Sequence, residues 1–136
     1  MQNNDDDIDE LLVSRGLRLT RQRRQLAGLL FRDGDRHVTA EMLAREAKRN
    51  GIRVSLATVY NTLHQFTRAG LLRRINVDSA RTWFDTNTTV HHHFFNTSSL
   101  ELTDIPQDRV SVDVLPAPPD GTAIDHVDVV VRVTPR

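Results

Sequence analysis

The sequence of 136 residues contains no cysteine. This absence excludes disulfide bonds, cysteine nucleophiles and metal sites built on thiolates, including a structural zinc site of the four-cysteine kind. A bound metal must therefore be held by nitrogen and oxygen atoms. For the same reason, a bound haem can have no cysteine ligand.

The sequence also lacks any apolar run close to the ~20 residues that a membrane-spanning helix needs. Its first ten residues are acidic, whereas a secretion signal begins with basic and then apolar residues. We therefore expect a cytoplasmic protein that does not bind membranes. The length suits one ordinary domain or two very small lobes that share a core.

The chain has no net charge, but its charges are divided unevenly along the sequence. Residues 1–10 carry five acids and no base, for a charge of −5. Residues 11–81 carry fifteen bases, fourteen of them arginine, against five acids, for +10, and residues 82–136 carry three bases against eight acids, for −5. The planar guanidinium group of arginine suits phosphate and the edge of guanine. The basic block therefore favours a module that binds nucleic acid, joined to a second lobe with another task.

Apolar spacing and capping residues predict four helices in the basic block. The last three helices each begin at a Thr or Ser that can cap them, and glycine follows three of the four. The expected helices are residues 8–15, 20–32, 39–50 and 55–69, and the fourth is expected to bury Leu56, Val59, Leu63 and Phe66. Two short alternating strands follow, at residues 71–76 and 81–85.

Helices followed by a hairpin predict a winged helix-turn-helix, in which the last helix enters the major groove of DNA and the hairpin flanks the backbone. We expect Ser55 and Thr58 to contact phosphate near the helix N-terminus. Asn61 can pair with adenine, and the Tyr60 ring can pack on thymine methyl groups. Tyr60 could instead be a core aromatic, because it borders the apolar stripe. The hairpin supplies basic residues for phosphate contacts, namely Arg73, Arg74 and Arg81.

Three consecutive histidines, His91 to His93, stand out in the acidic half of the chain. In an extended strand His91 and His93 point to the same side, and His92 points to the other. Imidazole is a common ligand of iron, zinc, copper and nickel, so the pair can act as a metal clamp. A solvated polar loop is an equally good interpretation of the tripeptide alone.

Several motifs occur in a specific order along the chain. They are Gly-Leu-Arg-Leu-Thr at 16–20 with Arg23, His-Val-Thr-Ala-Glu at 37–41, Ser-Leu-Ala-Thr-Val-Tyr at 55–60, Gln-Phe at 65–66, Ala-Gly-Leu at 69–71 and the histidine triplet. In this order the chain resembles the ferric uptake regulators of bacteria over residues 8–105, with a weaker match at 125–133. The resemblance implies a dimeric, metal-responsive transcription regulator, mainly a repressor in iron or haem homeostasis. It also implies an N-terminal winged helix and a C-terminal α/β dimerisation lobe.

The resemblance further implies functional residues. In the family a basic residue at the position of Arg18 enters the minor groove, and the position of Tyr60 contacts bases. Thr20 and Arg23 of the same motif are therefore also expected to contact DNA, in a homodimer bound to a palindromic operator. The regulatory metal site of the family falls on five residues, His37, Asp85, His91, His93 and Asp104. This donor set suits Fe(II), Mn(II) or Zn(II), and metal binding would favour the arrangement that spaces two recognition helices for the operator.

Departures from the family's pattern indicate which branch of the family the chain resembles most. Residues 96–99 are Asn-Thr-Ser-Ser where many members have Cys-x-x-Cys, so the structural zinc site is lost. The long helix usual after this point is replaced by an expected strand at 108–113, three prolines and an expected buried strand at 124–133. These features resemble the iron response regulators, which respond to haem, and histidines would then be the haem ligands. The family also has a second metal site, which would fall on His92 and His126.

Three alternatives remain. A peroxide-sensing regulator of the same family would use the same site of three histidines and two aspartates. A cupin-like metalloenzyme could use His91, His93 and Glu101, but it needs a β-barrel, and the first half predicts helices. A winged-helix interaction module without a ligand would leave the five donors unexplained. We therefore predict a non-enzymatic α+β protein, with a DNA-binding domain at 1–86 and a dimerisation and metal-sensing domain at 87–136.

Overall fold

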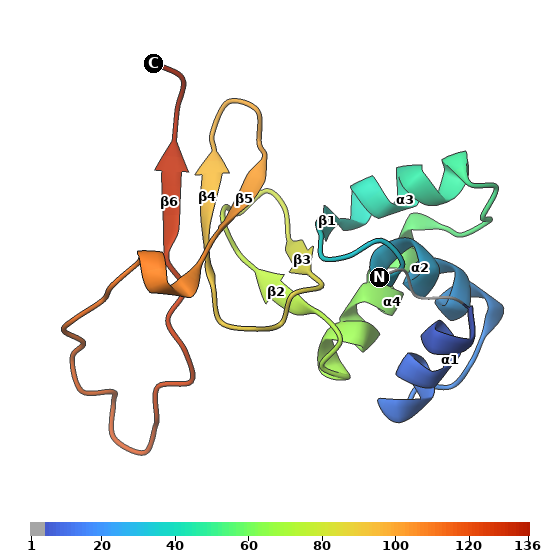
Figure 1. The fold of residues 1–136 in the computed structure, drawn as a ribbon, viewed down its shortest axis with the longest axis horizontal. Helices are drawn as coiled ribbons and strands as arrows, with labels where there is room; N and C mark the ends of the chain where they lie inside the picture. The colour runs from blue at the N-terminus through green and yellow to red at the C-terminus, as the bar shows by residue number, and fades with distance from the viewer. Residues whose placement is uncertain (1–4) are drawn as a thin grey trace. The chain divides into compact units, whose positions relative to one another are not determined.

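The computed structural model describes residues 5–136, so the first four residues of the predicted DNA-binding domain lie outside the described part. The chain divides into two compact units, residues 1–88 and 89–136 (Figure 1). The described elements of the first unit are α1 (Asp5–Ser14), α2 (Arg21–Phe31), β1 (His37–Thr39), α3 (Ala40–Arg49), α4 (Leu56–Arg68), β2 (Arg73–Ile75) and β3 (Trp83–Asp85).

Three of the four helices begin where a hydroxyl side chain caps them. Thr20 accepts a hydrogen bond from the backbone N–H of Arg23 at 3.2 Å, and Thr39 accepts one from Met42 at 3.2 Å. Ser55 does the same for α4, with an oxygen-to-nitrogen distance of 3.1 Å to Thr58. Such caps satisfy N–H groups that have no partner within the helix. All three were predicted from the sequence, and they are confirmed.

The helices of the first unit pack around one apolar core. Every helix contributes to it, together with β1 and β3, because each carries apolar residues on one face. The residues that are fully shielded from solvent include Leu26, Leu30, Val38, Leu43, Val59, Leu63, Phe66 and Phe84. Leu56 does not belong to this stripe. It is 44% exposed, because it is the first residue of α4 and lies outside the packed turns.

The first unit also contains a small antiparallel sheet with the strand order β1-β3-β2. Strands β2 and β3 form the predicted hairpin. Strand β1 was not predicted, because three residues between an Asp-rich loop and a helix cap are too few to show an alternating pattern. It pairs with β3 so that His37 lies opposite Asp85. The winged helix-turn-helix is therefore completed by a third strand.

The second unit is a three-stranded sheet with the order β5-β4-β6, formed by β4 (His92–Asn96), β5 (Leu102–Ile105) and β6 (Val130–Val133). Strand β4 is antiparallel to β5 and parallel to β6. A short 3₁₀ helix, η1 (Gln107–Arg109), follows β5. The buried apolar side chains are Phe95, Leu102 and Ile105, and they are accompanied by the three buried histidines. Among the described residues, no helix is both long and apolar enough to cross a membrane.

Two predictions for the second unit were wrong. Residues 108–113 do not form a strand: they continue from η1 into irregular chain, where Ser111 donates a hydrogen bond to Asp113. Local bonds of this kind compete with strand pairing. The predicted buried strand at 124–133 is confined to β6, and Ile124 is 49% exposed. An apolar run alone does not show which of its residues find a strand to pair with.

Candidate metal-binding groups and nucleic-acid interface

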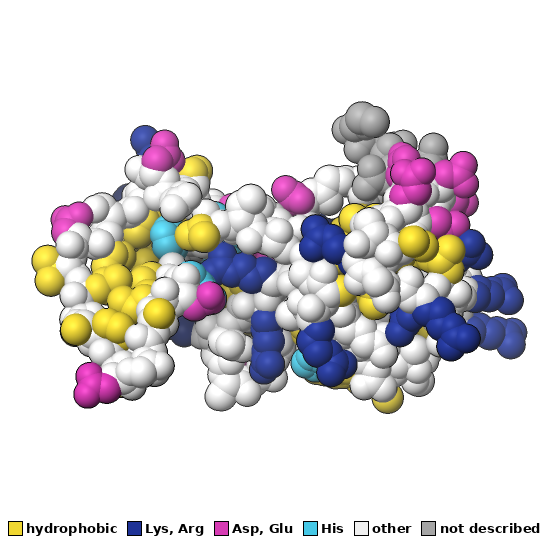
Figure 2. Space-filling view, turned by 90° about the horizontal axis from the view of Figure 1, so that it is seen from below, with side chains coloured by type: hydrophobic (Ala, Val, Ile, Leu, Met, Phe, Trp, Pro, Cys, Tyr) yellow, Lys and Arg dark blue, Asp and Glu magenta, His cyan; other side chains and the backbone are white. Residues whose placement is uncertain are grey.

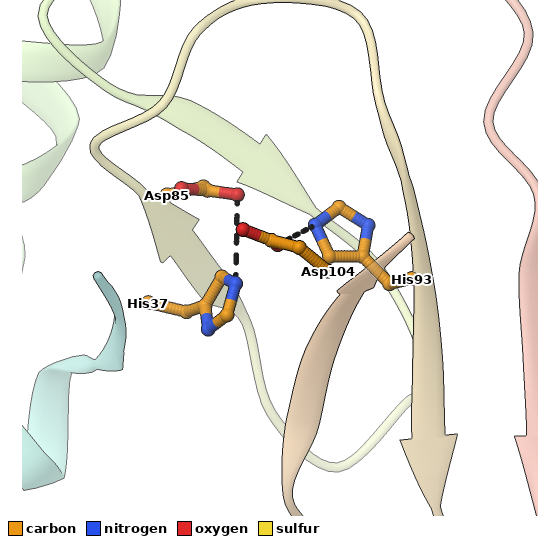
Figure 3. A group of neighbouring side chains, drawn as sticks. All are labelled: His37, Asp85, His93 and Asp104. Carbon is orange, nitrogen blue, oxygen red and sulfur yellow. Dashed lines mark ion pairs between the residues drawn. The ribbon is translucent and has the colours of Figure 1, made fainter. Parts of the chain in front are cut away.

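The first unit contains a histidine and an aspartate on adjacent strands, here called the donor pair. The imidazole Nε2 of His37 on β1 lies 3.8 Å from Oδ2 of Asp85 on β3 (Figure 3). The Asp85 side chain is only 1% exposed, and its Oδ1 accepts a hydrogen bond from the backbone N–H of Asn87 at 2.8 Å. One carboxylate oxygen is thus fixed by the backbone, and the other faces the imidazole. A buried carboxylate needs a nearby positive charge or donor, so the pair suits a cation.

The second unit contains two histidines that share one carboxylate, here called the donor cluster. Nε2 of His91 lies 3.2 Å from Oδ1 of Asp104, and Nε2 of His93 lies 3.3 Å from the same oxygen. His93 on β4 is opposite Asp104 on β5 in the strand register (Figure 3). Both imidazole rings are buried, with centroids 4.5 Å apart. The triplet is therefore not a solvated polar loop, and His91 and His93 share a face as predicted.

The hydrogen bond on the far side of His91 defines what its Nε2 can do. Nδ1 of His91 lies 2.7 Å from the backbone carbonyl oxygen of Thr89, so Nδ1 must carry the hydrogen. In the neutral ring, Nε2 is then a lone-pair donor that faces an oxygen of Asp104. Two lone pairs at this distance repel each other unless a cation, either a proton or a metal ion, lies between them. A carbonyl that fixes the tautomer in this way is typical of metal-ligating histidines.

The predicted second site at His92 and His126 has no comparable geometry. Nδ1 of His92 accepts a hydrogen bond from the backbone N–H of Val129 at 3.0 Å, which joins β4 to the segment before β6. His126 lies between two carboxylates, with Nδ1 bonded to Asp125 and Nε2 3.0 Å from Asp128. The two histidines thus have separate partners.

The surface around α4 carries the residues predicted to contact DNA. Arg18, Thr20, Ser55 and Asn61 are exposed, and Thr58 is half-buried beside the α4 cap. On the face shown in Figure 2, arginine and lysine side chains gather over the first unit. The hairpin residues are Arg74, which is exposed, and Arg73 and Arg81, which are half-buried. The hairpin turn is ordered by Asp78, whose Oδ1 accepts from the backbone N–H groups of Ala80 at 3.0 Å and Arg81 at 3.1 Å.

A shallow cleft of about 220 Å³ separates the start of α2 from α4. It is lined by the polar residues Thr20, Gln22, Arg23, Thr58, Asn61, Thr62 and Gln65. Arg23 is fixed in it, because Nε and Nη2 donate to Oε1 of Gln65 at 3.2 and 2.9 Å and Nη1 donates to the Arg18 carbonyl at 2.9 Å. Gln65, which fixes Arg23 in this cleft, was not among the residues predicted from the sequence. Its position one helical turn after Asn61 is the signal that indicates a shared face.

Tyr60 is half-buried, and its ring packs against the core. Its hydroxyl donates a hydrogen bond of 3.0 Å to Oε1 of Glu41 on α3. This hydrogen bond, with a smaller contribution from burial, raises the pKa of the Tyr60 hydroxyl above its usual range. The ring therefore packs on the core, as the core-aromatic interpretation expects, while the hydroxyl remains at the surface. Contact of Tyr60 with bases stays a prediction.

Comparisons with known proteins agree with this fold. Residues 14–117 match the ferric uptake regulator family. Over 85 residues the chain is 34% identical to the ferric uptake regulation protein of Rhizobium leguminosarum bv. viciae, in an alignment that covers 62% of this chain and 59% of the relative. The match thus spans about three fifths of the length of that relative.

Two solved structures have the same fold. The Vibrio cholerae ferric uptake regulator superposes with a TM-score of 0.73 at 21% identity, covering 93% of this chain and 98% of the other. The Pseudomonas aeruginosa ferric uptake regulator with manganese gives a TM-score of 0.70 at 24% identity, covering 94% and 97%. The predicted α+β class, with a winged helix-turn-helix followed by a lobe that contains a sheet, is confirmed.

Proposed function

Because the chain belongs to the ferric uptake regulator family, we propose that it is a metal-responsive transcription regulator that binds operator DNA through its first unit. The family is one of regulators, so the chain is not an enzyme, and the cupin-like alternative is set aside. The observation that carries the metal response is the donor cluster, in which Nε2 of His91 faces Oδ1 of Asp104 at 3.2 Å. A metal ion between these atoms would accept a lone pair from each of them and so prevent their repulsion.

The proposed metal is Fe(II), Mn(II) or Zn(II), held by five ligands. The donor cluster supplies His91, His93 and Asp104, and the donor pair supplies His37 and Asp85. Three imidazoles and two carboxylates suit these ions, and the relative from P. aeruginosa was solved with manganese. A metal bound by residues of both units would favour one arrangement of the units. The increase in the population of that arrangement is limited by how much more tightly it binds the metal than the other arrangements do.

The same histidines favour a compact ion over haem. His91 and His93 are 4% and 1% exposed, and each directs its Nε2 atom to a carboxylate oxygen. A porphyrin needs an open face beside its axial ligand. We therefore place the chain with metal-sensing repressors of iron homeostasis, and the haem response of the iron response regulators is the weaker proposal. A peroxide sensor would use the same five ligands.

DNA binding is proposed for α4 and the basic residues around it. Ser55 and Thr58 at the start of α4 would contact phosphate, together with Arg23, Arg74 and Arg81. Tyr60 and Asn61 would contact bases in the major groove, and Arg18 would enter the minor groove. A dimer with two such helices would bind a palindromic operator.

Operator binding with and without metal tests this function. The protein is purified without a His tag, stripped with a chelator and used to select an operator from random DNA in Mn(II). Fluorescence anisotropy is then expected to show about tenfold tighter operator binding with Mn(II) than without it. Mg(II), which prefers oxygen ligands, serves as the control. Operator affinity that stays the same after addition of either Mn(II) or Fe(II) would contradict the proposed metal response.

A further inference from the structure

Glu41 is an unusual residue for its place on the first unit. The block of residues 11–81 carries only five acids against fifteen bases. Glu41 is one of these acids, it is exposed, and it accepts the hydrogen bond from the hydroxyl of Tyr60 on the recognition helix. A carboxylate next to a surface that approaches phosphates is repelled by them and weakens DNA affinity. Its presence therefore points to a role other than affinity.

The Tyr60 ring is held from two directions. Its hydroxyl is bonded to Glu41, and its face lies on the imidazole of His64 one turn later, with centroids 6.3 Å apart and planes at 21°. His64 in turn meets the edge of Phe84 at 5.7 Å and 82°, and Phe84 is completely buried. The support of the ring thus continues into the core. A side chain fixed in this way loses little rotational freedom when it meets a ligand.

Glu41 is itself well anchored. It lies in the first turn of α3, where the helix dipole stabilises a negative side chain, and Thr39 caps that helix. Its hydrogen bond therefore links the tyrosine to a rigid element other than its own helix. Removal of the carboxylate would leave the Tyr60 hydroxyl without this acceptor and would let the ring move on α4.

We infer that Glu41 is a positioning residue that holds the Tyr60 ring for contact with a thymine methyl group, so that base discrimination increases at some expense in overall affinity. The inference rests on the proposed function of α4 in contacting bases. The matching partner is a thymine in the major groove, whose methyl group is its distinguishing feature there. Loss of a buried methyl contact corresponds to about a fourfold change in affinity.

Thymine-to-uracil replacement in the selected operator measures this contact directly, because uracil lacks only the methyl group. Each thymine is replaced in turn, and the contacted one is identified as the position whose uracil penalty disappears in Tyr60→Ala. The penalty there is expected to be about fourfold in the wild type. It should fall close to onefold in Glu41→Ala and in Tyr60→Phe, which keeps the ring but lacks the hydroxyl.

Glu41→Gln is the matched control, because the amide keeps an acceptor oxygen but removes the charge. Glu41→Gln should keep the uracil penalty of the wild type. In a protein that already carries Tyr60→Phe, Glu41→Ala should not change the uracil penalty further. A wild-type penalty in Glu41→Ala or in Tyr60→Phe would overturn the inference while leaving the proposed function intact. A chain that selects no operator, or that shows no position sensitive to Tyr60→Ala, would overturn the base-contact proposal and this inference together. If Glu41→Ala does not fold, the inference is tested by Tyr60→Phe, which should lose the uracil penalty, and by Glu41→Gln, which should keep it.

Discussion

Asp104 has the most consequential position of any single residue in the donor cluster. One of its oxygens lies within 3.3 Å of the Nε2 atoms of both His91 and His93. Its side chain is 43% exposed, whereas the two imidazoles are buried. Both imidazoles therefore share a carboxylate that solvent can reach. In the proposed metal site, Asp104 would therefore be the ligand that an incoming ion meets first.

Replacement of Asp104 by Asn should weaken metal binding without affecting the fold. The amide has nearly the same shape but lacks the negative charge that a divalent cation prefers, so we expect at least a tenfold higher Kd for Mn(II). Isothermal titration calorimetry with the stripped protein measures it. Asp108→Asn on η1 is the matched control, since Asp108 is exposed and lies outside the donor cluster. Equal Mn(II) affinities for the two variants would count against the proposed ligand set.

The elements of the first unit were largely predictable because their signals are local. Thr20, Thr39 and Ser55 fix where helices begin, and apolar spacing fixes which face is buried. The elements of the second unit depend on strand pairing over long separations, such as β4 with β6, and a single strand pattern does not contain that information. This is why residues 108–113 were assigned wrongly. Among the proposed donors, spacing alone predicts that His91 and His93 share a face but leaves a polar loop as an equal alternative, whereas His37, Asp85 and Asp104 needed the family resemblance.

The end of α4 provides a test of one local signal. Gly70 has φ of +80°, and a Cβ atom there would lie 2.8 Å from Nη1 of Arg15, which donates to the Gly70 carbonyl at 3.3 Å. Gly70→Ala is therefore expected to lower the free energy of unfolding by about 1 kcal/mol or more. Gly34→Ala is the control, because Gly34 has φ of +86° and nothing within 4 Å of such a Cβ. Urea denaturation measures the free energy of unfolding of both variants. The loss in Gly34→Ala reports the backbone strain alone, and an equal loss in Gly70→Ala would exclude a contribution from the Arg15 contact.

An ion pair between the loop before β1 and α3 should make the first unit sensitive to acid. Arg36 donates to Glu46 through both Nη atoms, at 2.9 and 2.7 Å. This hydrogen bonding holds the pKa of Glu46 below its usual value of 4.5. Because the folded-state pKa is lowered, the stabilisation is fully present above pH 4.5 and is lost as pH falls through the folded-state pKa.

Glu46→Gln should accordingly destabilise the protein at neutral pH by about 1 kcal/mol. The difference from the wild type should shrink as the pH falls below 4.5, where the unfolded wild type begins to bind the proton, and should vanish below the folded-state pKa, where Glu46 is protonated in the folded wild type as well. Urea denaturation across this pH range measures the difference. Asp120→Asn, at an exposed site in the irregular segment before β6, provides the baseline. A Glu46→Gln effect that does not change with pH would indicate packing rather than the ion pair.

On the scale of the whole molecule, the two units differ in surface chemistry. The first is basic, and the second exposes apolar side chains on its sheet and its irregular segment (Figure 2). Phe94 on β4 and Val131 on β6 are paired in the strand register, and they are 41% and 38% exposed. Exposed apolar groups of this kind mark interaction surfaces. A second copy of the chain is the partner that the proposed palindromic operator would require.

Phe94→Asp is therefore expected to dissociate the proposed homodimer, because it would place a charge in an apolar contact that becomes buried only when the two copies associate. Sedimentation equilibrium measures the oligomeric state, and operator binding measures the consequence. A dimer gains affinity because the second recognition helix binds its half-site within the same complex. The wild type should therefore bind a full palindrome much more tightly than a half-site. In the variant, the ratio of these two affinities should fall by at least a factor of about 100. Val13→Asp, a change at an exposed apolar residue of α1, should leave the dimer intact. A wild-type protein that sediments as a monomer, or a Phe94→Asp protein that remains dimeric, would place the contact between copies elsewhere.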